Sequence, residues 1–404
     1  MNLDLATRRR FVIVLGCLTG MGAFSVDVSL PSIPAMAVDL ATSMSVGQQI
    51  VGVFMLGIAL GQLPAGLMSD RVGRIPVILT GLGIFTFAGI VTTVAPTIEV
   101  MLAARFVQGL GTSVGVVVSR AIVRDIASGR QAASMLSIMV MIFTAAPMVA
   151  PILGGYLVAA FDWRAPFAAV TVLGALILFT VSRTLHETRT PNRDHHILRQ
   201  LAMSAREFFS HRTSILGLVL VVLPAMGFMS VITGSSALIM DIYGYSETEF
   251  GYIFALAGVG ILAGSALNRK LLTRFNSMQM AGLGAFLIGV AALQLVYIAL
   301  AGAAPFWWVW SNVCLYMCGV SFLMANATAM ALDPVPNIAG AASSIIGTIQ
   351  NLFASTSAIV SGIIYDGSVS TSVILMGFFG TATLAAFLLR GLVLRRQPLR
   401  QMAD

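Results

Sequence analysis

Two charged residues stand inside stretches of this sequence that are otherwise apolar, and both could do chemistry there. Asp27 lies in GAFSVDVSLPSIP, and Arg105 lies in MLAARFVQGLGTSVG with Gln108 one helical turn further on. Loss of water disfavours an ionised carboxylate, so we expect Asp27 to gain and lose a proton near neutral pH as its exposure changes. An arginine does not deprotonate in proteins, so a buried Arg105 needs an anion or several carbonyl groups as partners.

Each of these two residues also has a plainer interpretation. Pro31 and Pro34 could end the first apolar run, which would put Asp27 at the outer water interface. Glu99 marks one end of the run that holds Arg105, so this arginine could instead reach out to the surface. Charges inside membrane spans generally mark functional sites. We therefore favour proton coupling or substrate binding, although the sequence does not indicate whether Asp27 and Arg105 meet.

A short charged stretch, GLMSDRVGRIP at 66–76, separates two long apolar runs and predicts a tight hairpin at the membrane surface. Gly66 and Asp70 would share one helix face. Gly73 permits backbone angles that other residues resist, and Arg71 and Arg74 supply the positive charge.

The apolar runs offer no catalytic or metal-binding constellation. All three cysteines lie in apolar runs, as small packing residues do, and no C-x-x-C pair is present. All four histidines lie in the polar stretch 186–212, where solvated side chains are the ordinary case and a metal site is the less favoured alternative. No nucleotide-binding glycine loop occurs. We therefore expect no enzyme, no bound metal and no cofactor, with a proton gradient as the energy source.

Composition indicates that most of the chain lies in a membrane. The 404 residues are 58% hydrophobic and only 10% charged, with a mean hydropathy of +0.93. The apolar residues gather in runs of about twenty, the length that crosses a bilayer, and backbone groups in lipid require such runs to be helices. We predict an all-α membrane protein with twelve spans at 11–34, 46–67, 75–95, 98–119, 132–158, 165–185, 213–239, 248–268, 278–301, 306–331, 338–363 and 369–394.

Basic residues predict which connections share a side of the membrane. With the N-terminus in the cytoplasm, all of the 23 Lys and Arg residues except Arg105 and Arg164 fall in or beside cytoplasmic segments. Both termini are then cytoplasmic. Because the net charge of +7 is scattered over these segments, we expect no nucleic-acid partner. A cleaved signal peptide over the first run is the alternative, with an A-x-A-like site at 35–37, but it would leave an odd number of spans.

One hydrophilic stretch divides the chain near its midpoint. We predict an N-terminal six-helix half at 1–185, a cytoplasmic inter-domain loop at 186–212 and a C-terminal six-helix half at 213–404. GSALNR at 264–269 repeats the G-x-x-x-[DN]-R pattern of GLMSDR at 66–71. Paired six-helix halves are a known transporter plan, with the substrate site between the halves near the membrane midplane.

The fifth predicted span carries a pattern that favours a kinked and closely packed helix. Pro147 and Pro151 each remove a helical hydrogen bond. Gly154 and Gly155 follow, and such small residues let a neighbouring helix approach. Ordinary membrane-helix packing would use the same residue types.

Several of these stretches resemble the major facilitator superfamily of transporters. The stretch 66–76 is similar to its loop motif G-x-L-A-D-R-x-G-R-[RK], which it matches at Gly66, Asp70, Arg71, Gly73 and Arg74 but not at Met68, Ser69 and Ile75. The stretch 150–155 is similar to the G-P-x-x-G-G motif of proton-coupled exporters, with Ala150 in place of the first glycine. Five further stretches resemble the bicyclomycin-resistance and chloramphenicol-efflux branch of this superfamily. They are VDVSLPSIPAMAVDL, RFVQGLGTSVGVVVSRAIVRD, DWRAPF, DIYGYSETEFGYIFAL and AGAASSIIGTIQ.

This resemblance implies a bacterial inner-membrane exporter of small, amphiphilic drugs or metabolites, driven by protons entering in exchange. It implies that Asp27 handles the proton or a cationic substrate and that Arg105 takes part in coupling. It implies an inner gate hinge formed by Asp70, Arg71, Arg74, Arg124 and Asp125. A monomer in the lipid bilayer is the corresponding expectation for assembly.

Three other functions stay open at this point. Proton-coupled uptake of a small nutrient is the nearest, and the proline and glycine pattern of the fifth span favours export over it. A channel would lack the saturable, exchange-dependent flux that identifies a carrier. A membrane receptor or sensor without transport is the alternative from a different class.

Overall fold

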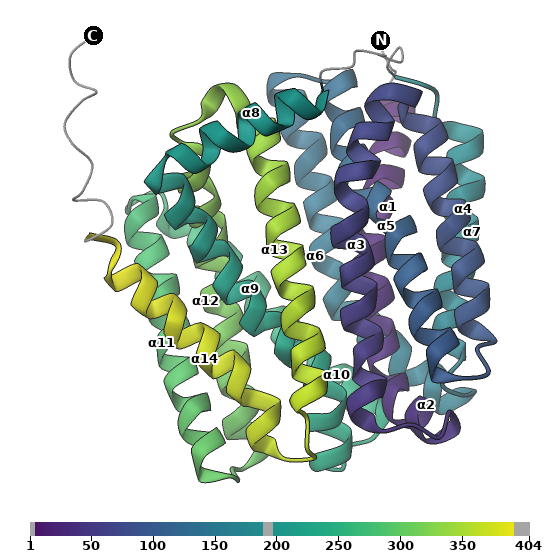
Figure 1. The fold of residues 1–404 in the computed structure, drawn as a ribbon, viewed down its shortest axis with the longest axis vertical. Helices are drawn as coiled ribbons and strands as arrows, with labels where there is room; N and C mark the ends of the chain where they lie inside the picture. The colour runs from purple at the N-terminus through teal and green to yellow at the C-terminus, as the bar shows by residue number, and fades with distance from the viewer. Residues whose placement is uncertain (1–4, 189–196, 392–404) are drawn as a thin grey trace.

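The computed structural model describes residues 5–188 and 197–391, and every regular element within them is a helix (Figure 1). In chain order these are α1 (Leu5–Ser29), η1 (Leu30–Ser32), α2 (Ile33–Asp39), α3 (Met44–Val72), α4 (Arg74–Thr93), α5 (Ile98–Ile126), α6 (Gly129–Ala160), α7 (Ala165–Thr184), α8 (Ile197–Ser210), α9 (Arg212–Ser236), η2 (Ala237–Ile242), α10 (Glu247–Leu271), α11 (Ser277–Ala301), α12 (Phe306–Leu332), η3 (Pro336–Ile338), α13 (Ala339–Ile364) and α14 (Val369–Leu388).

Eleven of the helical segments in the described residues are long and apolar enough to cross a membrane. The predicted span at 338–363 coincides with α13, a helix of 26 residues that is not among those eleven. Its middle carries Gln350 and Asn351 as well as several serine and threonine residues, which lower its hydropathy. Because α13 packs along α3 and α9, these polar groups need not all face lipid (Figure 1).

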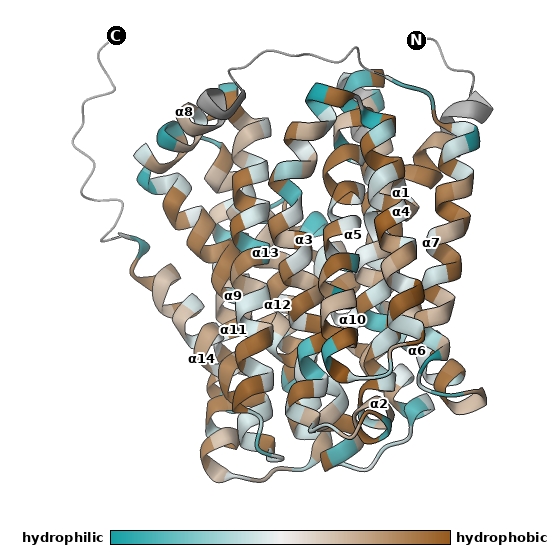
Figure 2. Ribbon diagram, turned by 45° about the vertical axis from the view of Figure 1, so that its right-hand side comes forward, coloured by the Kyte–Doolittle hydropathy of each residue, from teal (hydrophilic) through white to brown (hydrophobic). Residues whose placement is uncertain are grey.

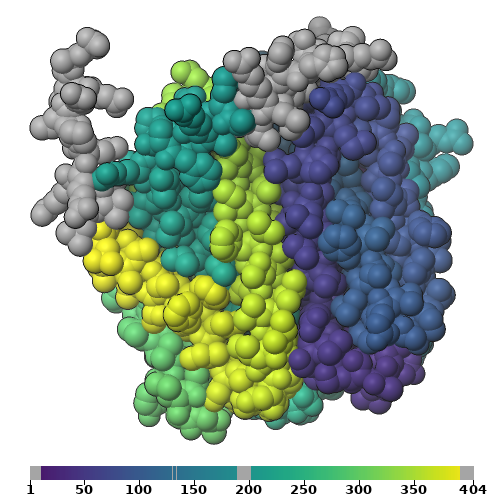
Figure 3. Space-filling view, in the orientation of Figure 1, coloured from purple at the N-terminus to yellow at the C-terminus, as the bar shows by residue number. Residues whose placement is uncertain are grey.

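The long helices form two groups that stand side by side. Helices α1 to α7 make one group, in purple to blue, and α9 to α14 make the other, in teal to yellow (Figure 1). The groups meet mainly where α13 packs along α3 and where α10 packs along α6. The first of these contacts runs down the front of the molecule, as a yellow-green band beside a purple one (Figure 3).

The two ends of the bundle differ in what they carry. The α8 end holds helix α8, which lies across the bundle, and the connections at 72–74, 126–129 and 332–339 (Figure 1). The α2 end holds helix α2 and the connections at 93–98, 160–165, 301–306 and 364–369 (Figure 1). The stretch 186–212, which we predicted as a loop, contains α8, because its apolar residues recur at helical spacing and bury Phe208 against the bundle.

Apolar residues cover much of the length of the helices (Figure 2). Phe87 and Leu176 are among the large apolar side chains that are exposed on this surface. At the α2 end Tyr297, Trp307 and Trp308 are exposed as well. Aromatic side chains of this kind gather where a membrane meets water, so the α2 end carries one of the two interfaces.

The first helix of each group changes its geometry at the α2 end. Helix α1 passes through the 3₁₀ turn η1 into α2, and α9 widens into the π-helical turn η2. The two irregular segments meet, because Ser236 Oγ donates a hydrogen bond of 2.7 Å to the carbonyl oxygen of Leu30. Departures of this type are common at functional hinges.

Candidate functional site

Asp27 lies inside the bundle rather than at a helix end. Its side chain belongs to a residue that is only 4% exposed. The helical segments α1, η1 and α2 follow one another without interruption, so the helical path continues past Asp27 and ends at Asp39. Pro31 and Pro34 tighten and redirect this path but do not end it. The position of Asp27 is therefore that of a buried acid.

Helix α1 turns Asp27 towards α6. Gly20 lies against the backbone of Phe143 in α6, and Asp27, seven residues later, shares the same face of α1. One residue beyond Asp27, the carbonyl oxygen of Val28 lies against Gly154 of α6. Asp27 is thus at the level of the proline segment of α6, which the sequence alone could not reveal.

Arg105 is fully buried and bonded to neutral groups. Its Nη1 donates to Gln108 Oε1 at 2.9 Å and to Ser25 Oγ at 3.0 Å, and its Nη2 reaches the Ser25 carbonyl oxygen at 3.5 Å. The guanidinium carbon lies 4.3 Å from the ring centre of Phe54 and 5.6 Å from that of Phe167. Cation–π contacts of this kind are strongest where water is excluded. Arg105 does not extend to the surface.

The structure brings Arg105 and Gln108 together but does not pair Arg105 with Asp27. Within the described residues no ion pair joins the two charges. They are linked through α1 instead, because Ser25 holds the guanidinium and lies two residues before Asp27. Ser25 is a contact that sequence reasoning missed, since its partner lies 80 positions away.

The acid and the arginine in this arrangement have different chemical capacities. A buried carboxyl group is a proton acceptor whose charge is costly without water. The Arg105 guanidinium is held by Ser25 and Gln108 on the other side of α1, because Ser25 and Asp27 are two residues apart on the helix and point in opposite directions.

The charged stretch after α3 forms a compact ion cluster at the α8 end. The Arg74 side chain, 4% exposed, bonds to Asp70 Oδ1 through Nη1 at 2.7 Å and to Asp125 Oδ2 through Nε at 2.9 Å. Its Nη1 also donates to Ser69 Oγ at 2.8 Å. Arg74 therefore ties the end of α3 to the end of α5. The hairpin is tighter than predicted, because α3 continues to Val72 and only Gly73 separates it from α4.

Glu187 completes this corner, and sequence reasoning missed it. Its two carboxylate oxygens accept hydrogen bonds from the backbone N–H groups of Arg74 at 2.9 Å and Ile75 at 3.1 Å. A carboxylate at a helix N-terminus satisfies donors that the helix leaves unpaired. Gly73 has a φ of 113°, and any side chain there would also press on the Glu187 carboxylate. The Glu187 carboxylate can therefore reach these N–H groups only because position 73 has no side chain.

The other predicted gate residues are placed differently. Arg71 is exposed, one turn before the buried Arg74. Arg124 is exposed and its guanidinium lies against Gly340 at the start of α13, across the boundary between the two groups. Gly66 packs against Val117 of α5. Arg124 and Asp125 are neighbours in sequence, but Asp125 binds Arg74 within its own helix group whereas Arg124 contacts the other group.

The predicted glycine pair in α6 lies where helices cross most closely. Gly154 touches the carbonyl oxygen of Val28 in α1, and Gly155 touches that of Glu247 at the start of α10. Pro147 and Pro151 lie within α6, which continues through both of them. The backbone of Pro151 in turn lies against Gly251 of α10. This segment of α6 is therefore the point of contact with both its own group and the other one.

Alanine at position 155 should loosen the contact between α6 and α10. A methyl group there would collide with the Glu247 carbonyl oxygen, and forcing extra atoms into a packed site costs about 1–3 kcal/mol. Gly83→Ala is the matched control, because nothing lies within 4 Å of the added carbon. We expect a lower melting temperature in detergent for Gly155→Ala only. Equal melting temperatures for the two variants would contradict this packing.

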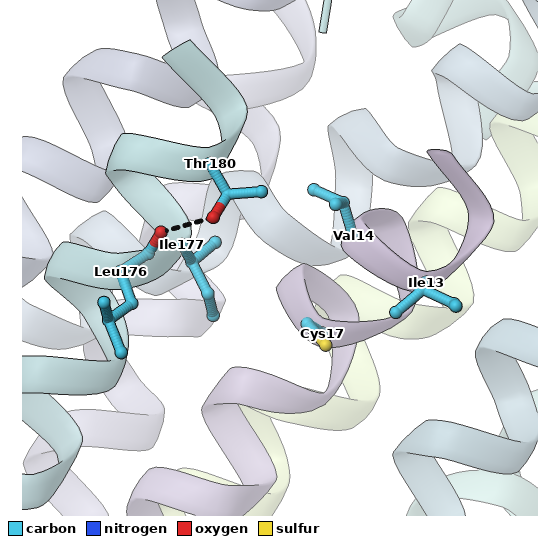
Figure 4. A pocket seen from close by; sticks show the side chains of 6 residues that line it. All are labelled: Ile13, Val14, Cys17, Leu176, Ile177 and Thr180. Atoms are coloured by element: carbon cyan, nitrogen blue, oxygen red, sulfur yellow. Dashed lines mark hydrogen bonds between the residues drawn. The ribbon is translucent and has the colours of Figure 1, made fainter. Parts of the chain in front are cut away.

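An apolar crevice of about 200 Å³ opens between α1 and α7, lined by Ile13, Val14, Cys17, Leu176, Ile177 and Thr180 (Figure 4). The one hydroxyl group in it is already satisfied, because Thr180 Oγ1 donates to the Leu176 carbonyl oxygen at 2.7 Å. Cys17 lies about 12 Å along α1 from Ser25. The crevice therefore has no polar group with which to orient a ligand.

No group of three or more His, Cys, Asp or Glu side chains in the described residues could hold a metal ion. His195 and His196, for which a metal site was the less favoured interpretation, lie outside the described residues.

Residues 14–358 match the family model of the Major Facilitator Superfamily. The chain belongs to this superfamily. The membership predicted from the sequence is thereby confirmed, and so is the twelve-helix, two-half fold class.

Curated relatives of this superfamily member agree with the branch that the sequence resembles. It is 31% identical to a bicyclomycin resistance protein homolog of Haemophilus influenzae over 84% of this chain and 85% of that one. It is 28% identical to multidrug resistance protein D of Escherichia coli over 91% and 92%. Among solved structures, a D-xylose-proton symporter shares the fold with a TM-score of 0.76 at 15% identity, covering 95% of this chain and 97% of that one. This likeness concerns the fold alone.

Proposed function

We propose that this superfamily member exports small, amphiphilic drug-like molecules across a bacterial inner membrane in exchange for protons. Two relatives with similarity over most of the chain are named for drug resistance. The observation that carries the coupling is the buried Asp27, which shares helix α1 with the serine that holds Arg105. The proton gradient supplies the energy, and the transporter needs no cofactor.

Coupling requires that proton and drug prefer different orientations of the two halves, since a ligand without such a preference shifts no equilibrium. We propose Asp27, Arg105 and Gln108 as the coupling site, and Asp70, Arg71, Gly73, Arg74, Arg124 and Asp125, preceded by Gly66, as the gate at the α8 end. The contact of α6 with α1 and α10 would change between these orientations. Its shape would depend on Pro147, Pro151, Gly154 and Gly155.

Orientation and organisation complete the proposal. The α8 end faces the cytoplasm, because it carries the basic residues Arg71, Arg74 and Arg124. The halves are 1–185 and 213–404, with 186–212 between them, and the protein works as a monomer. The α2 end then faces the periplasm.

The purified protein in lipid vesicles should move drug and protons in opposite directions. With a pH gradient imposed, we expect saturable movement of bicyclomycin, chloramphenicol or a lipophilic cation against the proton flow, measured by drug content and by a pH-sensitive dye. An ionophore that collapses the gradient should abolish it. Movement of the solute with the proton would instead establish uptake, and a flux that does not saturate would establish a channel.

A further inference from the structure

Three side-chain hydrogen bonds join described residues of the two helix groups, and all three lie at the α2 end. They connect Ser45 Oγ to the Gly362 carbonyl oxygen at 2.6 Å, Ser236 Oγ to the Leu30 carbonyl oxygen at 2.7 Å, and the hydroxyl groups of Tyr156 and Tyr252 at 2.7 Å. We call these three pairs the latch. Together with the contact of Gly155 on α10, they show that the bundle is closed at its α2 end.

Gln48 lies within this closed region and has no partner. It follows Ser45 by three residues in α3, and a side chain added at Gly362 of α13 would contact its Cβ as well as the Cγ of Gln49. The residue is 0% exposed, yet neither its Nε2 nor its Oε1 has a hydrogen-bond partner in the part of the chain that the structure describes. An amide with two donors and two acceptors is thus enclosed between the halves.

A buried polar group without a partner is costly, and the cost disappears when the group reaches water. The latch hydrogen bonds favour the closed α2 end. Gln48 acts in the other direction, because separating α3 from α13 would expose its amide. The same seam therefore contains groups that hold it shut and a group that opposes closure.

We propose that Gln48 is a gating residue whose enclosed amide offsets the latch, so that the closed and open forms of the α2 end are close in free energy. This inference rests on the proposed alternating-access function. It assigns to Gln48 a role in positioning the two halves, separate from proton coupling at Asp27. A carrier needs two forms of similar free energy, because a ligand can shift their ratio only by as much as its affinities for the two forms differ.

The opening of the α2 end can be measured directly by distances between spin labels. Val38 in α2 and Ala303 between α11 and α12 are exposed and belong to different groups, so cysteines placed there report the opening. The background would carry serine in place of Cys17, Cys314 and Cys318. Ser128 and Thr273 give a matching pair at the α8 end. Distances are recorded in lipid nanodiscs across a range of pH, with and without drug.

Gln48→Leu should raise the ratio of closed to open forms at the α2 end by about tenfold, and Gln48→Met should act the same way. Ser45→Ala and Ser236→Ala should lower that ratio. Gln49→Leu is the matched control, since it makes the same chemical change one residue away, on a side chain that also lies against Gly362 but is only partly buried.

A Gln48→Leu distribution equal to that of Gln49→Leu, or shifted towards the open form, would overturn the proposal. A single distance in wild type under all conditions would overturn it too. The spin-label shifts do not depend on transport. If they occur in a protein that exchanges no drug for protons in vesicles, the proposed function fails and the role of Gln48 in the equilibrium stands.

Discussion

Asparagine at position 27 is expected to abolish the coupling of drug movement to protons while leaving the fold intact. The substitution keeps the size and hydrogen-bonding capacity of the side chain but removes its ability to take up a proton. Coupling between two ligands is typically worth about 5–150-fold in affinity, and this factor should fall to one. Drug-triggered proton release from the purified protein, followed with a pH-sensitive dye, is the direct measurement.

The matched control for Asp27→Asn is Asp39→Asn, at the far end of the same continuous helical segment. Asp39 accepts hydrogen bonds from Trp163 Nε1 at 3.0 Å and from Arg164 Nη1 at 2.9 Å, and its side chain is 48% exposed. Drug-triggered proton release from Asp39→Asn should equal that from the wild type. Equal release from wild type and Asp27→Asn would show that another group carries the proton, even if drug binding were normal.

Alanine at position 74 is expected to destabilise the protein more than any other single change in the charged stretch at the α8 end. Arg74 is the cation shared by Asp70 and Asp125, so its removal leaves two carboxylates close together with their common partner gone. Breaking a buried ion pair costs about 3–5 kcal/mol. Because the Asp70 side chain is 33% exposed and can be hydrated, the lower end of that range applies.

Arg71→Ala tests whether this effect belongs to the ion cluster or to charge in general. Arg71 is exposed and three residues from Arg74, and surface substitutions usually change stability by less than about 0.5 kcal/mol. Unfolding in detergent, followed by tryptophan fluorescence, should separate the two variants clearly. Arg74→Lys should recover only part of the loss, since an ammonium group lacks the fork that engages two carboxylates at once. Similar losses for Arg71→Ala and Arg74→Ala would refute the assigned cluster.

The helical architecture could be predicted from the sequence because membrane insertion imposes a length and an apolar composition on each span. The run predicted at 75–95 became α4 at Arg74–Thr93, and the run at 278–301 became α11 at Ser277–Ala301. The ends of two runs were less accurate: the fourth stopped at 119 where α5 continues to Ile126, and the first stopped at 34 where the helical path continues to Asp39. Two prolines that usually end a helix are here accommodated by a 3₁₀ turn.

The candidate site could be predicted only as a set of unusual residues. Charge inside an apolar run is visible in a sequence, so Asp27 and Arg105 could be singled out, and Arg74 could be singled out as part of the charged stretch 66–76. The residues that bind these side chains could not be predicted. Ser25 and Glu187 are ordinary residue types whose bonding partners lie 80 and 113 positions away, and such pairs are fixed by how the helices pack rather than by local pattern. Gln48 carries no sequence signal at all, because its significance lies in the absence of a partner.

The polar character of α13 also bears on how the protein is made. Polar side chains lower the tendency of a segment to leave the translocation channel for lipid on its own. Helix α13 emerges after α3 and α9, the two helices along which it packs. Its entry into the bilayer would therefore depend on the groove that these earlier helices provide, so that the helix at the seam between the halves is also the one whose insertion requires both halves to be present.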